Sequence, residues 1–383
     1  MHISRVLNPP GKSFFLMGPR GTGKSTWLKA VFSKAVTFDL LDEEVFQRLL
    51  AAPGLFQDEL RRLIPGSWVV VDEIQRLPDL LNEVHKAIEE QQLHFVLCGS
   101  SARKLKRAGV NLLAGRALHR SMHSFIPEEL GVKFKLDDAI RFGLLPIVFA
   151  SEDREETLKA YTRLYLKEEI QAEALIRNLP GFARFLPIAA LLHGNIVNVS
   201  NVAREARVAR TTTVGFFEIL EDTLVCFYLP AFEAKLRMRE RKLAKLYWCD
   251  PGLVRALKNT TGIPSPEEYG ILFEGFIAQL IRSYRDYRNL CDEFYYWAPI
   301  GRTQTEVNFL LRRNDKFIAI EVKSGRQFSE GWCKGLRVIK ALGGIKRRLV
   351  VYPKGPGLTT KDGIEIVPFA EFSDLLARDA LWP

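Results

Sequence analysis

One short segment limits the possible folds of this 383-residue chain more than any other: Gly18-Pro19-Arg20-Gly21-Thr22-Gly23-Lys24-Ser25. Its spacing is GxxxxGK[ST], with an apolar run at 13–17 before it and a helical segment from Thr26 to about Ser33 after it. Glycines let backbone N–H groups close around phosphate oxygens, and the N-terminus of the following helix adds a favourable dipole. The sequence therefore predicts a phosphate-binding loop between a strand and a helix.

The residue types in this loop predict individual roles. Lys24 is expected to reach the β- and γ-phosphates of a nucleotide, and the Ser25 hydroxyl to enter the coordination shell of Mg²⁺. The residues expected to contact the nucleotide here are Gly18, Pro19, Arg20, Gly21, Thr22, Gly23, Lys24, Ser25 and Thr26.

A second apolar run, Trp68-Val69-Val70-Val71, ends in two acidic residues, Asp72 and Glu73. Such a continuous run is typical of a parallel strand covered on both faces. Asp72 is expected to hold Mg²⁺ through water, and Glu73 to orient or deprotonate the attacking water. Further strands at 35–39 and 93–98 alternate with helical stretches at 43–52 and 76–91, which predicts a doubly wound parallel sheet.

Two further positions follow the strand at 94–98. Ser100 or Ser101, directly after that strand, is a candidate sensor of the γ-phosphate, with a helix-capping serine as the equal alternative for either one. If subunits form a ring, Arg116 can enter the neighbouring subunit's site and stabilise charge in the transition state. The alternative is an ordinary surface arginine.

Together these motifs resemble a prokaryotic family of AAA+-type ATPases with a C-terminal domain of unknown function of the DUF4143 type. The resemblance rests on the phosphate loop and on residues 72–75, 99–105 and 112–116, and it extends over essentially the whole chain. It implies Mg-ATP as the nucleotide, which phosphate-loop chemistry alone does not select. It also implies these roles: Walker A for Lys24 and Ser25, Walker B for Asp72 and Glu73, sensor 1 for Ser100 or Ser101, and arginine finger for Arg116.

We expect four domains, with the ATPase core at 1–125 and a helical lid at 126–178. Apolar positions at helical spacing support the lid, for example in 160–170. A second sensor arginine stays open between Arg154, Arg163 and Arg177.

Residues 179–262 are predicted to form a winged helix-turn-helix. Short helices ending at Ala206 and beginning at Thr211 have the expected spacing, and the second is the candidate DNA reader. Strands at 224–232 and 243–248 would flank a basic wing that touches phosphate. The alternative is a winged helix that only packs against other domains. The candidate DNA contacts are Arg207, Arg210, Thr211, Thr212 and Thr213 at the helix, and Lys235, Arg237, Arg239, Arg241 and Lys242 on the wing.

Residues 263–383 resemble the restriction-endonuclease-like PD-(D/E)xK core. That resemblance implies metal binding at the positions of Asn308 and Glu321, and a Lys323 that positions or activates water. Glu306, on the same strand face as Asn308, and Glu274, on the preceding helix, are the further candidates of this nuclease-like site. Asn replaces the expected Asp at 308, and an amide oxygen brings no charge to a hard cation. We therefore favour an inactive nucleic-acid-binding domain over a nuclease; a charge pair on a solvated face is the further alternative.

The charge of the chain is unevenly distributed. The net charge is +10, and residues 301–350 alone hold 12 Lys and Arg against 4 Asp and Glu, which favours an anionic backbone as partner or serves solubility. The 5 cysteines have no zinc-ligand or disulfide-framework spacing. No apolar run approaches the roughly 18 to 20 residues of a membrane span. We expect a cytoplasmic protein without membrane contact.

The leading hypothesis is therefore an ATP hydrolase with an α/β fold. It would act as a homo-oligomeric ring, with a hexamer as one option, and would couple ATP turnover to DNA binding or remodelling. A nucleotide-regulated, metal-dependent DNA nuclease and a non-enzymatic ATP-gated scaffold are the alternatives.

Overall fold

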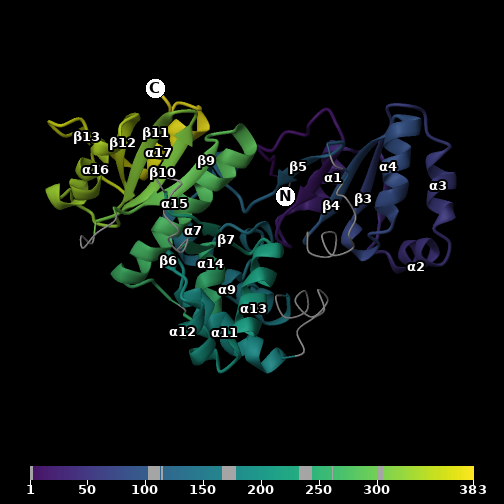
Figure 1. Ribbon diagram of the computed structural model, residues 1–383, viewed down its shortest axis with the longest axis horizontal. Coiled ribbons are helices and arrows are strands. Elements are labelled where there is room, and N and C mark those ends of the chain that lie inside the picture. The colour runs from purple at the N-terminus through teal and green to yellow at the C-terminus, as the bar shows by residue number, and fades with distance from the viewer. Residues whose placement is uncertain are drawn as a thin grey trace.

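The computed structural model describes residues 3–101, 113, 115–165, 178–232, 244–260, 262–299 and 305–383. Figure 1 shows three parts of the chain: an α/β part with α1 to α4 at the right, a largely helical part around α11 to α13 at the bottom, and a sheet with β9 to β13 at the upper left. Across the described residues, no helix combines the length and the apolar character that crossing a membrane requires.

The N-terminal part is built on a five-stranded sheet in the order β2-β3-β4-β1-β5, with every neighbouring pair parallel. This confirms the parallel α/β prediction. Its strands are β1 (Phe14–Met17), β2 (Val36–Asp39), β3 (Trp68–Asp72), β4 (His94–Gly99) and β5 (Leu118–Ser121). Its helices are α1 (Lys24–Val31), α2 (Glu43–Ala51), α3 (Gly54–Leu60), η1 (Ile74–Arg76) and α4 (Leu80–Gln91).

Strand β5 was not expected from the sequence, because Leu118-His119-Arg120-Ser121 lacks an apolar run. Its partner decides its conformation: Phe14 lies opposite Leu118 and Met17 opposite Ser121. The edge strand of a sheet needs apolar residues on one face at most, so its sequence signal is weak.

The middle of the chain combines helices with a small antiparallel sheet in the order β6-β8-β7. Its elements before the sheet are α6 (Pro127–Leu130), η2 (Gly131–Lys133), α7 (Leu136–Phe142), α8 (Pro146–Phe149), α9 (Arg154–Ala160) and η3 (Tyr161–Tyr165). They are followed by α11 (Leu179–Leu191), β6 (Asn195–Ile196), α12 (Val199–Ala206), α13 (Arg210–Asp222), β7 (Cys226–Leu229), β8 (Lys245–Trp248) and α14 (Pro251–Leu257).

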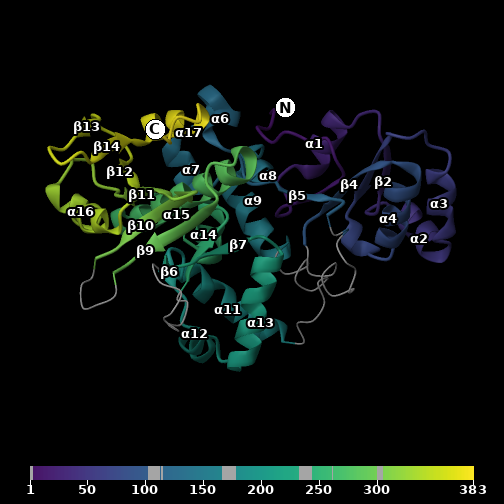
Figure 2. The ribbon, with the colours of Figure 1, turned by 45° about the horizontal axis from the view of Figure 1, so that its top comes forward.

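The C-terminal part is a mixed six-stranded sheet in the order β13-β14-β12-β11-β10-β9, with the long helix α15 (Pro266–Arg288) along it in both views (Figures 1 and 2). Its strands are β9 (Glu293–Trp297), β10 (Val307–Arg313), β11 (Lys316–Val322), β12 (Ile345–Tyr352), β13 (Leu358–Thr359) and β14 (Glu365–Pro368). Its other helices are η4 (Glu330–Cys333), α16 (Lys334–Val338), η5 (Ile339–Leu342) and α17 (Phe369–Ala377).

One hydrophobic core joins the middle and C-terminal parts. It extends from Phe125 to Leu381 and includes most of the apolar side chains of α15. The N-terminal sheet instead has separate clusters, with Phe15 and Val71 in one and Phe14 and Val70 in the other, as alternation along a covered strand requires. The middle and C-terminal parts therefore pack together around one close-packed core.

Candidate functional site

The loop between β1 and α1 has the backbone conformation of an anion-binding loop. Gly21 and Gly23 have φ of 77° and 84°, in the left-handed region that favours glycine. Gly23 caps α1 without a side-chain hydrogen bond, so the amides of the first helical turn remain available to an anion. The buried Lys24 ammonium donates to the carbonyl oxygens of Gly18 at 2.7 Å and Pro19 at 3.2 Å. Both acceptors are uncharged, so a bound phosphate would supply the negative charge that this buried cation favours.

The two acidic residues after β3 lie beside this loop. The Ser25 hydroxyl donates to Asp72 Oδ2 at 2.6 Å, and the Glu73 amide donates to Asp72 Oδ1 at 3.0 Å. Glu73 has φ of 58°, which is uncommon for a residue with a side chain and recurs at functional sites. A hydroxyl and a carboxylate in contact are oxygen ligands of the kind that Mg²⁺ prefers, so the residues present fit the expected ion.

A glutamine links the end of β3 to the end of β4. The Gln75 side-chain amide donates to Glu73 Oε2 and, at 3.1 Å, to the Ser100 hydroxyl. Ser100 is therefore joined to the acidic pair through one side chain. Burial raises the pKa of the Glu73 carboxyl, while Lys24 and the Gln75 hydrogen bond oppose that shift. Sequence reasoning did not select Gln75, since a glutamine in a short turn carries no chemical signature of its own.

A hollow of about 530 Å³ adjoins the phosphate loop, large enough for a nucleoside. Residues of the helical segment also hold the loop itself: the Ile147 amide donates to Gly21 O at 3.2 Å and the Tyr161 hydroxyl to Arg20 O at 2.9 Å. Apart from the loop residues Gly21, Thr22 and Gly23 and the nearby Thr26, the sequence did not predict the lining, because its members lie far apart and share no spacing. They include Ile3, Arg5, Trp27, Phe125, Ile147 and Phe149.

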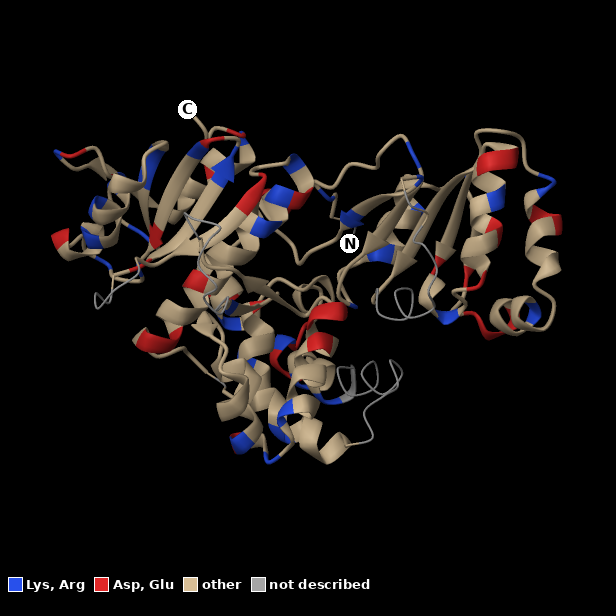
Figure 3. Ribbon diagram, in the orientation of Figure 1, with Lys and Arg blue, Asp and Glu red and all other residues tan. Residues whose placement is uncertain are grey.

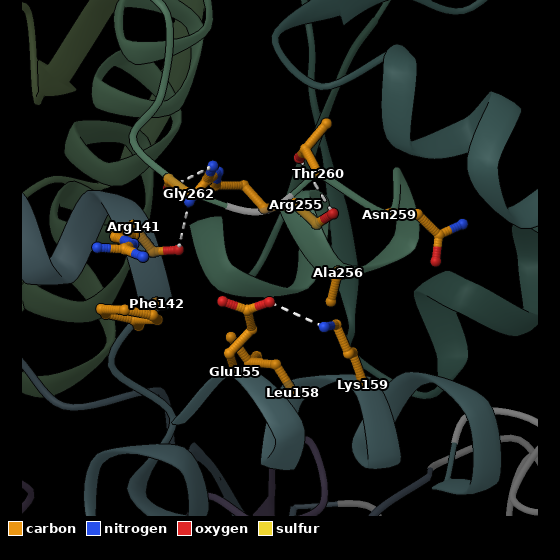
Figure 4. Close-up of a pocket in the computed structure, with 10 residues that line it drawn as sticks. All are labelled: Arg141, Phe142, Glu155, Leu158, Lys159, Arg255, Ala256, Asn259, Thr260 and Gly262. Atoms are coloured by element: carbon orange, nitrogen blue, oxygen red, sulfur yellow. Dashed lines mark hydrogen bonds and ion pairs between the residues drawn. The ribbon is translucent and has the colours of Figure 1, made fainter. Parts of the chain in front are cut away.

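A second hollow lies between α7, α9 and α14 and is drawn in Figure 4. Its volume is about 20 Å³, and Lys159 within it is paired with Glu155 at 2.8 Å. That space holds about one water molecule. The hollow at the phosphate loop, unlike this one, has room for a nucleotide.

Arg116 lies near the amino ends of the parallel strands, whereas Lys24 lies near their carboxyl ends. It precedes β5, whose first residue pairs with Phe14 at the start of β1, whereas the phosphate loop follows the end of β1. Its guanidinium forms an ion pair with Glu89 on α4. If Arg116 acts on a phosphate, that phosphate belongs to another subunit. Among the second-sensor candidates, Arg154 pairs with Asp138 and lies over the Phe149 ring, and Arg163 is exposed. Arg177 lies outside the described residues.

Some of the predicted DNA-contacting residues lie on the surface at the end of α12 and the start of α13. Arg207, Arg210 and Thr211 are exposed, and Thr212 is half-buried. Thr213 was wrongly included, because its side chain is fully buried and donates to Ala209 O at 3.1 Å. The predicted wing residues Lys235, Arg237, Arg239, Arg241 and Lys242 lie outside the described residues.

The nuclease-like residues are brought together around an unexpected lysine. The buried Lys245 ammonium, on β8, lies 2.9 Å from Glu306 Oε1 and 3.6 Å from Glu274 Oε1. The Tyr247 hydroxyl also donates to Glu274 Oε1, at 2.6 Å. We call these four residues the Lys245 cluster. An ammonium thus lies between two of the carboxylates that were expected in the nuclease-like site.

The other nuclease-like residues also satisfy one another. Lys323 pairs with Glu321 at 2.6 Å, and the Asn308 side-chain oxygen accepts the Val322 amide at 2.8 Å. The sequence had offered Asn308 as a metal ligand, but its oxygen is engaged within the sheet. Over the described stretches, no group of three or more His, Cys, Asp and Glu side chains is arranged to hold a metal ion.

Several arginines of residues 301–350 form ion pairs in the fold, whereas Lys316, Lys334, Lys340 and Lys346 are exposed. Blue and red bands are interspersed over this part in Figure 3. The pairs are Arg312–Glu293, Arg313–Asp379, Arg337–Glu330, Arg337–Asp362, Arg347–Glu365 and Arg348–Asp362. Most of these carboxylates lie outside the segment, so a count along the sequence could not include them.

Comparisons with known proteins divide the chain in three. An AAA domain matches residues 11–131, a domain of unknown function (DUF8612) residues 133–265, and another (DUF4143) residues 269–372. Uncharacterized proteins of Mycobacterium bovis and Mycobacterium tuberculosis are each 25% identical over 364 residues, which is 92% of this chain and 79% of theirs.

Three solved structures are remote matches. The Aeropyrum pernix ORC1 protein in complex with DNA matches 66% of this chain and 87% of its own, at 16% identity and a TM-score of 0.24. Protein VC1899 from Vibrio cholerae matches 96% and 97%, at 12% identity and a TM-score of 0.25. Can2 from Sulfobacillus thermosulfidooxidans, in complex with cyclic tetra-adenylate, matches 82% and 90%, at 10% identity and a TM-score of 0.22. Such scores carry no weight for fold or function.

The domain matches agree with the phosphate loop and the parallel sheet. An AAA domain at the N-terminus and a DUF4143 domain at the C-terminus are the arrangement that the sequence motifs predicted. The chain therefore carries an AAA domain at its N-terminus and a DUF4143 domain at its C-terminus.

Proposed function

We propose that this protein binds and hydrolyses Mg-ATP at the carboxyl edge of its parallel sheet, and that turnover is coupled to DNA binding or remodelling. One observation carries the first half: Lys24, the Ser25–Asp72 hydrogen bond and the half-buried Glu73 converge at one edge, beside a hollow of about 530 Å³. Cation, hydroxyl and carboxylates are the side chains that phosphoryl transfer to water requires.

Each group has a separate part in this proposal. Lys24 exchanges its two carbonyl acceptors for phosphate oxygens and so neutralises charge that develops on them. Ser25 and Asp72 would hold Mg²⁺, which supplies further positive charge to the phosphates. Glu73 accepts a proton from the attacking water, while Gln75 fixes its orientation and Ser100 lies next in the hydrogen-bond chain.

The test compares the wild type with Lys24→Ala and Glu73→Gln in both nucleotide binding and steady-state ATP hydrolysis. Lys24→Ala is expected to lose binding and turnover, and Glu73→Gln to keep binding and lose turnover. Lys29→Ala, an exposed lysine on the same helix, is the matched control and should behave as the wild type. Turnover that survives in Glu73→Gln would show that another group activates the water.

The exposed residues of α12 and α13 support the second half of the proposal. Arg207, Arg210 and Thr211 present two cations and a hydroxyl at the start of a helix that follows a tight turn, a geometry that meets DNA phosphates and base edges. Hydrolysis should rise when single-stranded or duplex DNA is added, and the stimulation should weaken at higher salt. An unchanged rate with either DNA would favour the ATP-gated scaffold.

The contacts of the C-terminal part favour this proposal over a metal-dependent nuclease. Lys245 lies between Glu274 and Glu306, and the side-chain oxygen of Asn308 accepts a hydrogen bond from a backbone amide. An ammonium between carboxylates offsets the charge that would attract a divalent cation. We propose that this domain acts in recognition or assembly, within a homo-oligomer that brings Arg116 to the neighbouring nucleotide.

A further inference from the structure

Arg5 joins the nucleotide site to the C-terminal helix α15. Its guanidinium Nη1 donates to Thr22 O, in the phosphate loop, at 2.9 Å, and its Nη2 donates to the Tyr287 hydroxyl on α15 at 3.2 Å. It also donates to His123 O at 2.6 Å and to Glu129 Oε1 at 2.9 Å. The side chain is only 5% exposed. A planar guanidinium with five fixed donors can hold several groups in one geometry, which a lysine cannot.

Two consecutive residues of α15 secure the segment that follows β5. The Tyr287 hydroxyl accepts the His123 amide at 2.9 Å, and the Asp286 carboxylate contacts His123 Nε2 at 2.7 Å. The C-terminal turn of α15 therefore contacts both Arg5 and the backbone beside the phosphate loop. A Cβ on Gly18 would lie 2.3 Å from the oxygen of Met122, the residue before His123, so loop and segment are in direct contact.

The same helix reaches the Lys245 cluster. Glu274 lies 13 residues before Tyr287 on α15, or about 20 Å along the helix axis, and it accepts the Tyr247 hydroxyl and faces Lys245. Between these ends, most residues of α15 are buried in the continuous core. A buried helix cannot bend freely, so a displacement at Tyr287 is carried along its length.

We propose that Arg5 and Tyr287 couple occupancy of the nucleotide site to helix α15, and through it to the Lys245 cluster. This inference rests on the proposed nucleotide site. Thr22 lies between the two left-handed glycines of the loop, so any change of the loop on binding phosphate moves the carbonyl that Arg5 holds. Because coupling is reciprocal, a ligand that shifts α15 from the C-terminal side alters nucleotide affinity by the same factor.

The test is hydrogen–deuterium exchange of the full chain, with and without Mg²⁺ and a non-hydrolysable ATP analogue. In the wild type, the analogue should slow exchange of amides in 274–288 by about fivefold or more. In Tyr287→Phe, which keeps the ring and removes the hydroxyl, the analogue should still bind but the slowing in 274–288 should disappear. Tyr284→Phe is the matched control, since its hydroxyl donates to Glu128 Oε2 at 3.0 Å and not to Arg5, and it should behave as the wild type.

Arg5→Lys provides a second variant that keeps the positive charge beside Glu129 while losing the guanidinium contacts, and it should show the same loss of slowing. A wild type that binds the analogue without any change in 274–288 would overturn the coupling and leave the proposed function intact. Slowing that persists in both Tyr287→Phe and Arg5→Lys would also overturn it. A wild type that does not bind the analogue overturns the proposed function and this inference together.

Discussion

The Ser25 hydroxyl donates a hydrogen bond of 2.6 Å to Asp72 Oδ2, across 47 residues of chain. The strands that deliver these residues are not neighbours, because β4 lies between β1 and β3 in the sheet. The contact forms since all the strands are parallel and the residues after β1 and β3 lie at the same edge. It places a hydroxyl and a carboxylate in direct contact with each other.

Removing either member of this pair should abolish the effect of Mg²⁺ on nucleotide binding. In EDTA, we expect Ser25→Ala and Asp72→Asn to bind ATP as tightly as the wild type does. With Mg²⁺ added, we expect their affinity for ATP to be lower than that of the wild type by about tenfold or more. Calorimetric titration with and without the metal measures this. Ser33→Ala, beyond the end of α1, is the control. Equal gains with Mg²⁺ in all these proteins would remove Ser25 and Asp72 from the metal site.

The pH dependence of hydrolysis should report the Glu73 environment. Burial raises the pKa of its carboxyl above the ordinary value of glutamic acid, about 4.3. The base acts only when deprotonated, so activity is present above this raised pKa and is lost as pH falls through it. Gln75→Ala removes a hydrogen bond that opposes the shift, and should move the acid limb of kcat/KM to still higher pH. An acid limb that is unchanged in Gln75→Ala would exclude Glu73 as the titrating group.

Arg116→Ala should lower turnover by about a thousandfold without weakening ATP binding, if the residue acts on a neighbouring subunit. Arg116 lies near the amino ends of the strands and Lys24 near their carboxyl ends, so the two residues can be tested in different subunits of one mixture. A mixture of Arg116→Ala and Lys24→Ala subunits should regain activity, because one supplies an intact nucleotide site and the other an intact arginine. A mixture as inactive as its components, with mixed oligomers verified, would contradict transfer between subunits.

Lys245 should contribute to the stability of the folded protein and not to any cleavage of DNA. Lys245→Met leaves Glu274 and Glu306 facing each other without a cation, and should lower the free energy of unfolding by about 2 kcal/mol in urea titrations. Lys245→Arg keeps the charge and should lose less. DNA cutting with Mg²⁺ or Mn²⁺ is expected in none of these proteins. Cutting by the wild type that disappears in Glu321→Ala would restore the nuclease hypothesis.

Arg207→Ala and Arg210→Ala should each weaken DNA binding and reduce the slope of log affinity against log salt by about one. Fluorescence anisotropy at several salt concentrations measures both quantities. Arg337→Ala is the matched control, because its guanidinium is already paired with Glu330 and Asp362. If Arg337→Ala has the larger effect, the DNA-binding face belongs to the C-terminal part.

The amino-acid sequence by itself determined the phosphate loop, the acidic pair after β3 and the parallel sheet. These features are local: a glycine-rich turn needs its own residues, and a strand covered on both faces is apolar throughout. The expected strands at 13–17, 68–71 and 93–98 therefore agree with β1, β3 and β4 to within a residue or so at each end.

Only the tertiary structure decided what surrounds those features. Arg5 contacts Tyr287 across 282 residues and Lys245 contacts Glu306 across 61, and neither pair has a spacing that a sequence pattern records. The excess of cations in 301–350 is partly offset for the same reason, since Arg347 pairs with a carboxylate on another strand, at Glu365. A buried charge requires a partner of opposite sign, and the packing of distant segments determines which residue provides it.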